Sequence, residues 1–202
     1  MQWINSQRKK INMNQNNIEQ IFNDQIENKK SIRATNYKQR IKKIKSIIDW
    51  IYLNQSLIRE SLHKDFSKPD LEIDITEIWI TIDLAKNVIK NLKNWVQPKR
   101  VPGSLSVSLA SSYIEYYSKG VCLVIAPWNY PFQLCVAPLI YSIAAGNCTI
   151  IKPSESTPHT SALVSSMIKE LFNENEVDEL IVIDIDATVK GREPDYKMII
   201  HY

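Results

Sequence analysis

Residues 120–156 read GVCLVIAPWNYPFQLCVAPLIYSIAAGNCTIIKPSES and contain no charged side chain between Lys119 and Lys152, although 23% of the chain is charged. A run of this length is either buried on every side in a protein core or embedded in lipid. Three prolines interrupt the run, and Asn129 and Gln133 would carry polar amides into hydrocarbon. No continuous apolar helix of the about 20 residues that a membrane span needs survives these breaks. The sequence therefore favours a soluble core and predicts no integral membrane span.

The breaks in this run predict a strand, a helix and a second strand. Residues 121–126 are apolar and rich in branched side chains, which predicts a fully buried strand. The proline-braced turn Pro-Trp-Asn-Tyr-Pro follows it. Residues 132–145 predict a helix, with a proline near its first turn and Gly146 where a left-handed cap belongs. A second buried strand over 147–152 would pair in parallel with the first through a right-handed crossover.

The same alternation continues towards the carboxyl terminus. Thr157 is the expected N-cap of a helix from Pro158 to about Phe172. A third apolar, branched run over residues 180–185 suits another parallel strand. Residues 121–186 therefore predict strand–helix–strand–helix–strand, which is half of a doubly wound nucleotide-binding sheet.

Two amphipathic helices are expected before this sheet. Apolar residues recur at steps of three and four from Tyr37 to Leu62, and again from Ile75 to Leu92. Ser67-Lys68-Pro69-Asp70 separates the two stripes, so a helical hairpin that packs on the sheet is expected, with a coiled coil as the alternative. The opposite face of the first helix is basic and is predicted to be solvated. It carries Lys38, Arg40, Lys42, Lys43, Lys45 and Arg59.

We therefore expect five segments along the chain. The polar amino-terminal segment carries a short amphipathic pattern at Ile11, Ile18, Ile21, Phe22 and Ile26, and Pro98 to Gly103 is a linker. Alternating serines and a run of aromatic residues then predict half-exposed strands. The segments are an arm (1–35), the helical hairpin (36–98), a β extension (103–118), a partial nucleotide-binding unit (119–186) and a tail (187–202).

The composition excludes several classes of function. A net charge of +3, with no Lys/Arg run interleaved with aromatic residues, gives no sign of a nucleic-acid partner. The three cysteines are widely spaced and form neither a disulfide framework nor a metal-ligand pattern, so no metal site is expected. The first residues, MQWINSQRKKINMNQ, lack an apolar core of signal-peptide length. A cytoplasmic location is therefore expected.

Several motifs together resemble the aldehyde dehydrogenase superfamily, most closely the branch that oxidises fatty and aromatic aldehydes. They are PWNYP, AAGN and IIKPSE, with TEIWITIDLAKNVIKNLKNW and VPGSL before them. The resemblance covers about residues 34–177 and matches the amino-terminal part of such enzymes. It implies an α/β, aldehyde dehydrogenase-like fold, namely an incomplete Rossmann-type parallel sheet preceded by a long helical hairpin. It also implies NAD(P)-dependent oxidation of an aldehyde to a carboxylate.

The resemblance assigns site roles to residues at the end of each strand. Asn129 would donate its amide to the oxyanion that forms when a nucleophile adds to the aldehyde. Lys152 and Glu155 would bind the adenosine ribose hydroxyls, and Glu155 would repel a 2′-phosphate, which favours NAD while leaving NADP possible. The nicotinamide side would be lined by Ile125, Ala126, Pro127 and Trp128. Structural alternatives are a turn-capping Asn129, a merely exposed Lys152 and a core Trp128.

The family's nucleophilic cysteine and general-base glutamate have no counterpart in the matched region. Cys122, Cys135 and Cys148 fall outside the family's nucleophile motif and are expected to be small core residues. The chain is therefore expected to be a fragment that is inactive alone, with an aldehyde as the substrate of the complete site. The alternative is a non-catalytic interaction or relic subunit that pairs with a full-length homologue through an open sheet edge. A homo-oligomer is the other expected assembly.

Overall fold

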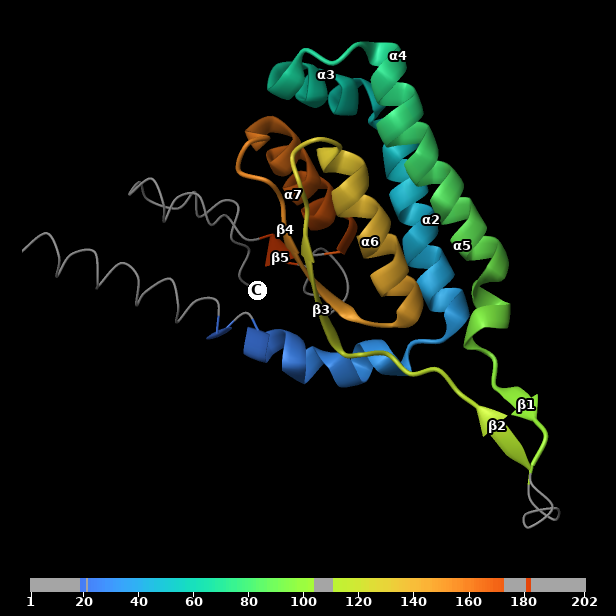
Figure 1. The fold of residues 1–202 in the computed structure, drawn as a ribbon. Coiled ribbons are helices and arrows are strands. Elements are labelled where there is room, and N and C mark those ends of the chain that lie inside the picture. The colour runs from blue at the N-terminus through green and yellow to red at the C-terminus, as the bar shows by residue number, and fades with distance from the viewer. Residues whose placement is uncertain (1–18, 21, 104–110, 173–180, 183–202) are drawn as a thin grey trace, which may run out of the picture.

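The computed structural model describes residues 19–20, 22–103, 111–172 and 181–182. A parallel three-stranded sheet in the order β3-β4-β5 forms one layer (Figure 1). Helix α6 packs on β3 and β4, and the pair α2 and α5 packs on α6 in turn. The helices are α2 (Tyr37–Leu53), α3 (Gln55–Phe66), α4 (Asp70–Ile73), the π-helix η1 (Asp74–Trp79), α5 (Ile80–Val96), α6 (Pro131–Ala145) and α7 (Pro158–Phe172). The strands are β1 (Lys99–Val101), β2 (Ser112–Ile114), β3 (Val121–Ile125), β4 (Cys148–Lys152) and β5 (Ile181–Val182). The fold is α/β, as predicted.

The strand–helix–strand unit has the expected elements, but its first strand is not buried. β3 and β4 pair in parallel, and β4 is buried from Cys148 to Ile151. In β3, by contrast, Leu123 and Ile125 are 59% and 67% exposed. The prediction of a fully buried strand over 121–126 is therefore wrong. The reason is that Leu123 and Ile125 share one face of the strand, whereas Val124, on the other face, packs against the hydrophobic core.

The first helix of the expected hairpin is two helices. The chain breaks at Asn54, whose backbone lies at φ −112° and ψ 21° and whose side-chain amide donates to the Trp50 carbonyl. After this break α3 leaves α2 and packs on α7 (Figure 1). The apolar stripe is nevertheless confirmed on both sides of the break, since Ile44, Ile51, Ile58 and Leu62 are fully buried.

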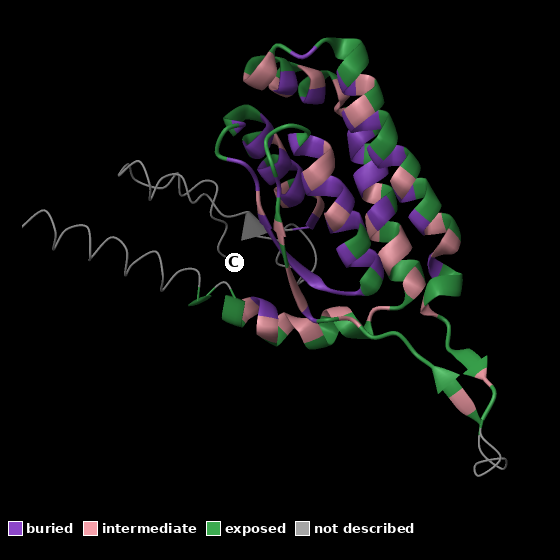
Figure 2. Cartoon of the chain, in the orientation of Figure 1, coloured by how far each residue is buried: buried purple, intermediate pink, exposed green. Residues whose placement is uncertain are grey.

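The second helix carries a π-helical segment, η1, that shifts its apolar phase. A π-helical turn adds a residue to the α-helical turn and so rotates the side chains that precede it. Ile75 is 54% exposed, against the expected stripe, whereas Glu77 is fully buried. From Ile78 onward the apolar stripe is as predicted. Figure 2 shows buried residues where α2, α5 and α6 face one another.

The basic face of α2 and α3 is only partly solvated. Lys38, Lys42 and Lys45 are exposed, as predicted. The Arg40 guanidinium instead donates to the Ala144 carbonyl at the end of α6 (3.1 Å). Arg59 is paired with Asp74 of η1, with its Nε 2.7 Å from the carboxylate. These two side chains hold helices together, and the prediction of a solvated face is wrong for both.

Strands β1 and β2 form a separate antiparallel pair that projects from the body of the molecule (Figure 1). β1 lies inside the stretch expected to be a linker. The half-exposed strand expected where apolar residues alternate with serines (residues 105–109) lies outside the described residues. The tail at 187–202 and the residues Ile11, Ile18 and Ile21 also lie outside them. Residues 22–34 are helical. Within the described ranges, no helix is both long enough and apolar enough to cross a membrane.

Gly146 ends α6 in the left-handed conformation, at φ 76° and ψ 38°, as predicted. Replacing Gly146 with alanine is expected to lower the free energy of unfolding by about 2 kcal/mol or more, since an L-residue is strained at this φ. The new Cβ would also collide with the Arg40 guanidinium, which would have to leave the Ala144 carbonyl. Urea unfolding of both proteins measures the loss.

The same substitution made in an Arg40→Ala protein separates the backbone strain from the collision with Arg40. In an Arg40→Ala protein the collision is removed, so the same glycine substitution should cost only the backbone strain. An equal cost in both backgrounds would contradict the collision with Arg40.

Candidate functional site

The carboxyl ends of β3 and β4 bring the predicted site residues to one edge of the sheet. Ile125 lies directly opposite Lys152 in the parallel register, and the Ala126 N–H donates to the Lys152 carbonyl (3.0 Å). The turn that contains Asn129 follows immediately. Because ligands of open α/β sheets bind outside the carboxyl ends of the strands, this edge is the candidate site.

The Asn129 turn is exposed. Trp128 is 58% exposed, so the alternative of a core tryptophan is wrong; its ring lies 6.2 Å from that of Phe66 on α3. Pro127 and Asn129 are also exposed, whereas Ala126 is buried. The turn therefore presents its amide side chain at the surface, where a ligand can reach it.

The loop after β4 holds a second polar group at the same edge. The Lys152 ammonium donates to the Glu155 carboxylate, and the two side chains are 17% and 50% exposed. Inside the loop, the Ser154 carbonyl accepts from the hydroxyls of Thr157 (3.2 Å) and Ser161 (3.0 Å). These two hydrogen bonds hold the buried side of the loop that carries the Lys152–Glu155 pair.

A buried ion pair between Lys68 and Glu77 contacts the Asn129 turn, and the sequence did not predict it. Glu77 of η1 is fully buried, and its Oε1 accepts from the Lys68 ammonium (2.8 Å). The other carboxylate oxygen accepts from the backbone N–H of Gln133 (2.9 Å). The same ammonium donates to the Asn129 carbonyl (3.1 Å) and lies 4.4 Å from the centre of the Tyr130 ring.

Burial raises the pKa of the Glu77 carboxyl above its ordinary value. The hydrogen bonds from Lys68 and from the backbone N–H groups of Gln133 and Phe132 oppose this shift. A signal for Glu77 exists in the sequence, since steps of three and four back from Val88 through Ala85 and Thr81 arrive at position 77.

A second carboxylate from the hairpin caps the N-terminus of α7. Asp65 of α3 accepts from the N–H groups of His159 (3.1 Å) and Thr160 (2.8 Å) and from the Thr160 hydroxyl (2.7 Å). Thr157 is the N-cap residue by position, as predicted, since α7 begins at Pro158 and the Thr157 carbonyl accepts from the Ser161 N–H (2.9 Å). Its hydroxyl instead donates within the preceding loop, so the side-chain cap is supplied by Asp65 of a distant helix.

Both helix N-termini at this edge are thus occupied by carboxylates of the protein. Glu77 binds the first turn of α6 and Asp65 binds the first turn of α7. A helix N-terminus is an anion site only while its N–H groups are free. The first-turn N–H groups of these two helices are therefore already bonded within the protein.

The cysteines do not provide a nucleophile at this edge. Burial and the nearby Glu77 charge raise the pKa of the Cys135 thiol to about 12, so it stays protonated at neutral pH. Cys148 is buried, whereas Cys122 is half-buried and departs from the expected core position. Among the described residues, no group of three or more His, Cys, Asp and Glu side chains could hold a metal ion.

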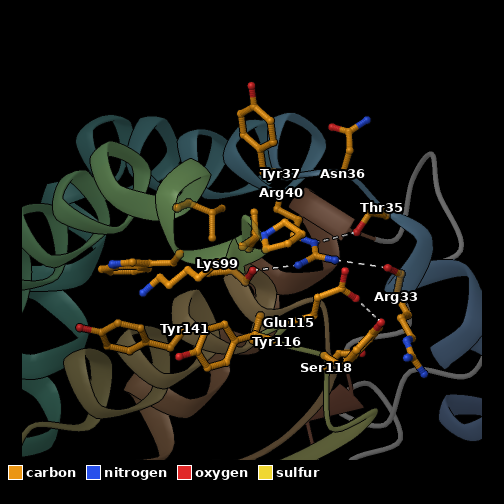
Figure 3. Close-up of a pocket in the computed structure, with 17 residues that line it drawn as sticks. Arg33, Thr35, Asn36, Tyr37, Arg40, Lys99, Glu115, Tyr116, Ser118 and Tyr141 are labelled. Carbon is orange, nitrogen blue, oxygen red and sulfur yellow. Dashed lines mark hydrogen bonds between the residues drawn. The ribbon is translucent and has the colours of Figure 1, made fainter. Parts of the chain in front are cut away.

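A separate cavity of about 780 Å³ lies between Arg33, Arg40, Lys99 and the ends of α5 and α6 (Figure 3). None of the predicted site residues lines it. Its basic side chains already have protein partners. The Arg40 guanidinium donates to three protein oxygens, Arg33 lies over the Tyr117 ring and Lys99 lies near the Tyr116 ring. This cavity is therefore not the candidate cofactor site.

A parallel α/β unit with an amide-bearing turn at one strand end and a Lys–Glu pair at the next is an arrangement that fits a dinucleotide-dependent enzyme. The sequence profile of the Aldehyde dehydrogenase family matches residues 8–189. The chain belongs to the aldehyde dehydrogenase family.

Individual relatives agree with this assignment. The 4,4′-diaponeurosporen-aldehyde dehydrogenase of Staphylococcus aureus is 41% identical over 157 residues, which are 78% of this chain and 33% of that protein. A substrate-bound structure of Staphylococcus aureus AldH superposes with a TM-score of 0.77 at 38% identity, over 86% of this chain and 38% of that one. Succinic semialdehyde dehydrogenase from Streptococcus pyogenes, in complex with NADP⁺, shares the fold at 16% identity (TM-score 0.71, over 86% of this chain and 37% of that one). The chain thus spans about a third of the length of the relatives it matches.

Proposed function

We propose that this chain supplies the oxyanion donor and the adenosine half of the cofactor site for NAD(P)-dependent oxidation of an aldehyde to a carboxylate. The observation that carries the proposal is the register of β3 and β4. It brings the exposed Asn129 turn and the Lys152–Glu155 pair to one edge of the sheet. Family membership supports the reaction class.

Asn129 acts on the carbonyl oxygen of the aldehyde. When a nucleophile adds to the carbonyl carbon, the oxygen becomes negative, and a fixed amide N–H stabilises it by a hydrogen bond. The bound dinucleotide supplies the hydride acceptor. Ile125, Ala126, Pro127 and Trp128 form the wall beside its nicotinamide, and three of these side chains are exposed enough to make contact.

Lys152 and Glu155 bind the adenosine ribose. Ammonium and carboxylate groups donate to and accept from two neighbouring hydroxyls. The pair is at the surface. The Glu155 carboxylate repels a 2′-phosphate, which favours NAD. Lys152 offsets part of this repulsion, so NADP also binds.

The nucleophilic cysteine and the general base come from outside this chain, and the chain alone turns over no aldehyde. This part of the proposal is supported by the buried, protonated state of Cys135 and by the position of Cys148 within the core. The complete site is cytoplasmic and includes a longer homologue, since further copies of this chain would lack the same two groups.

A second candidate function is that of a non-catalytic interaction subunit. It is favoured by the exposed Leu123 and Ile125 on β3, which has a described strand on one side only. Size measurement by light scattering, with and without a longer homologue, tests this pairing. A monomer in both conditions would contradict the interaction subunit.

Ligand-detected NMR tests the cofactor site directly. In saturation-transfer experiments with NAD, the adenine and ribose protons should receive magnetisation from the chain, and Lys152→Ala should abolish the transfer. Lys64→Ala is the matched control, because Lys64 forms a similar pair with Glu60 on an exposed surface (2.6 Å). Transfer that persists in Lys152→Ala would contradict the proposed ribose site.

An activity measurement completes the test. The purified chain, mixed with NAD and a long-chain or aromatic aldehyde, should form no NADH. Formation of NADH by the chain alone would show that it contains its own nucleophile and base.

A further inference from the structure

The Lys68–Glu77 pair contacts both the Asn129 turn and the helix that follows it. In the turn, the Lys68 ammonium donates to the Asn129 carbonyl (3.1 Å) and lies over the Tyr130 ring. In the first turn of α6, the Gln133 N–H donates to Glu77. The ion-pair bond of 2.8 Å joins these two contacts into one connected unit.

This arrangement is not explained by stability alone. The side chains of Lys68 and Glu77 are 9% and 0% exposed, and the removal of two charges from water costs several kcal/mol per ion before their attraction is counted. Apolar side chains of similar volume often stabilise a core as well or better. Glu77 also lies within η1, and π-helical turns are rare and frequently occur at functional sites.

The turn is restrained at its flanks by its two prolines and by the contact of the Trp128 ring with Phe66. Asn129 itself is exposed, so packing does not fix the direction of its side chain. After the turn, the Leu134 N–H donates to the Tyr130 carbonyl (2.9 Å) and starts the helix. The peptide that follows Asn129 is therefore held by the bond from Lys68.

We propose that Lys68 and Glu77 are positioning residues that fix the Asn129 turn, and with it the direction of the Asn129 amide. The ammonium holds the carbonyl of Asn129, and the carboxylate holds both the ammonium and the start of α6. Neither side chain touches the substrate. The inference rests on the proposed function only in giving the Asn129 amide a catalytic use.

The test must separate positioning from stability. Lys68→Met removes the ammonium and leaves the Glu77 carboxylate unpaired, so it lowers stability as well. The double variant Lys68→Met/Glu77→Leu removes both charges, and its unfolding free energy should return close to that of the parent. Its turn should nevertheless remain loose, because the bonds to the Asn129 carbonyl and the Gln133 N–H are still missing.

Two measurements on the whole chain report on the turn without using activity. Amide hydrogen exchange at Gln133 should be faster by about tenfold or more in the double variant, because its acceptor is gone. The side-chain amide of Asn129, followed by ¹⁵N relaxation, should show a lower order parameter. Lys68→Arg, which keeps a donor at this position, should retain more of the order than Lys68→Met.

Arg59→Met is the matched control, since Arg59 pairs with Asp74 in the same hairpin, away from the turn. It should leave both Gln133 and Asn129 unchanged. Parent-like exchange and order in the double variant would overturn the proposal, as would an equal effect of Arg59→Met. Failure of the ribose site in the saturation-transfer experiment with NAD would instead refute the proposed function and leave these two readouts unaffected.

Discussion

Replacing Lys68 with methionine is expected to lower the free energy of unfolding by about 3–5 kcal/mol at neutral pH, because it leaves a buried carboxylate without its partner. Glu77 is fully buried and keeps only its backbone hydrogen bonds in this variant. Urea unfolding followed by circular dichroism measures the loss. Lys64→Met provides the control, since Lys64 is half-exposed and its pair with Glu60 lies in solvent.

The loss should depend on pH in a defined direction. Burial holds the pKa of Glu77 above its ordinary value of 4.5, so the folded state binds this proton more tightly than the unfolded state does. The group's contribution to stability is therefore fully present below pH 4.5 and is lost as the pH rises through the folded-state pKa. In Lys68→Met the opposing ammonium is absent, so the pKa rises further and the deficit grows from acid towards neutral pH. A deficit that is the same at every pH would contradict an ionised, unpaired Glu77 as its cause.

Phe132→Ala is the second substitution with a large expected effect. Phe132 is fully buried at the start of α6, and truncation of a buried phenylalanine costs about 3–5 kcal/mol through lost burial and the cavity left behind. The backbone at this position, which contributes to the hydrogen bonding of Glu77, is unchanged. The loss should therefore appear as a lower urea midpoint that persists in acid, unlike that of Lys68→Met.

Tyr141→Ala is the matched control on the same helix. Tyr141 is 47% exposed, so its truncation removes less buried surface and should cost much less. Equal losses for the two substitutions would contradict the orientation of α6 on the sheet.

These effects connect the hairpin to the chemistry of the sheet edge. Asp65 and Glu77 come from neighbouring parts of the hairpin, and each fills the N-terminus of a different helix of the sheet unit. The hairpin thus does more than cover an apolar face. Its carboxylates accept from the first-turn N–H groups of α6 and α7, and in the proposed mechanism it also holds the turn that carries the oxyanion-stabilising amide.

Much of the sheet unit could be predicted from local sequence. α6 begins at a proline and ends at Gly146, and both signals act within one turn of the helix. Strand β4 and helix α7 also lie where their apolar patterns place them. The position of Asn129 and Lys152 at one edge follows from the parallel pairing that such a unit requires.

The remaining features depend on partners that are distant in the chain. Lys68 meets the Asn129 turn across 61 residues, Glu77 meets Gln133 across 56, and Asp65 reaches Thr160 across 95. No periodicity records such contacts, and propensity alone makes a buried lysine or glutamate an unfavourable expectation. The exposure of Leu123 and Ile125 likewise depends on what covers their face of the sheet, which is a property of the fold and not of the strand.

The amino-acid sequence by itself determined the order of the elements, the ends of α6 and the family, because these depend on neighbours within a few residues or on motifs of fixed spacing. Only the tertiary structure decided that Glu77 pairs with Lys68, that two carboxylates bind the helix N-termini and that Lys68 holds the Asn129 turn. The physical reason is that burial of a charged side chain is costly unless an oppositely charged or hydrogen-bonding group lies beside it. Here the fold brings that group from a distant part of the chain.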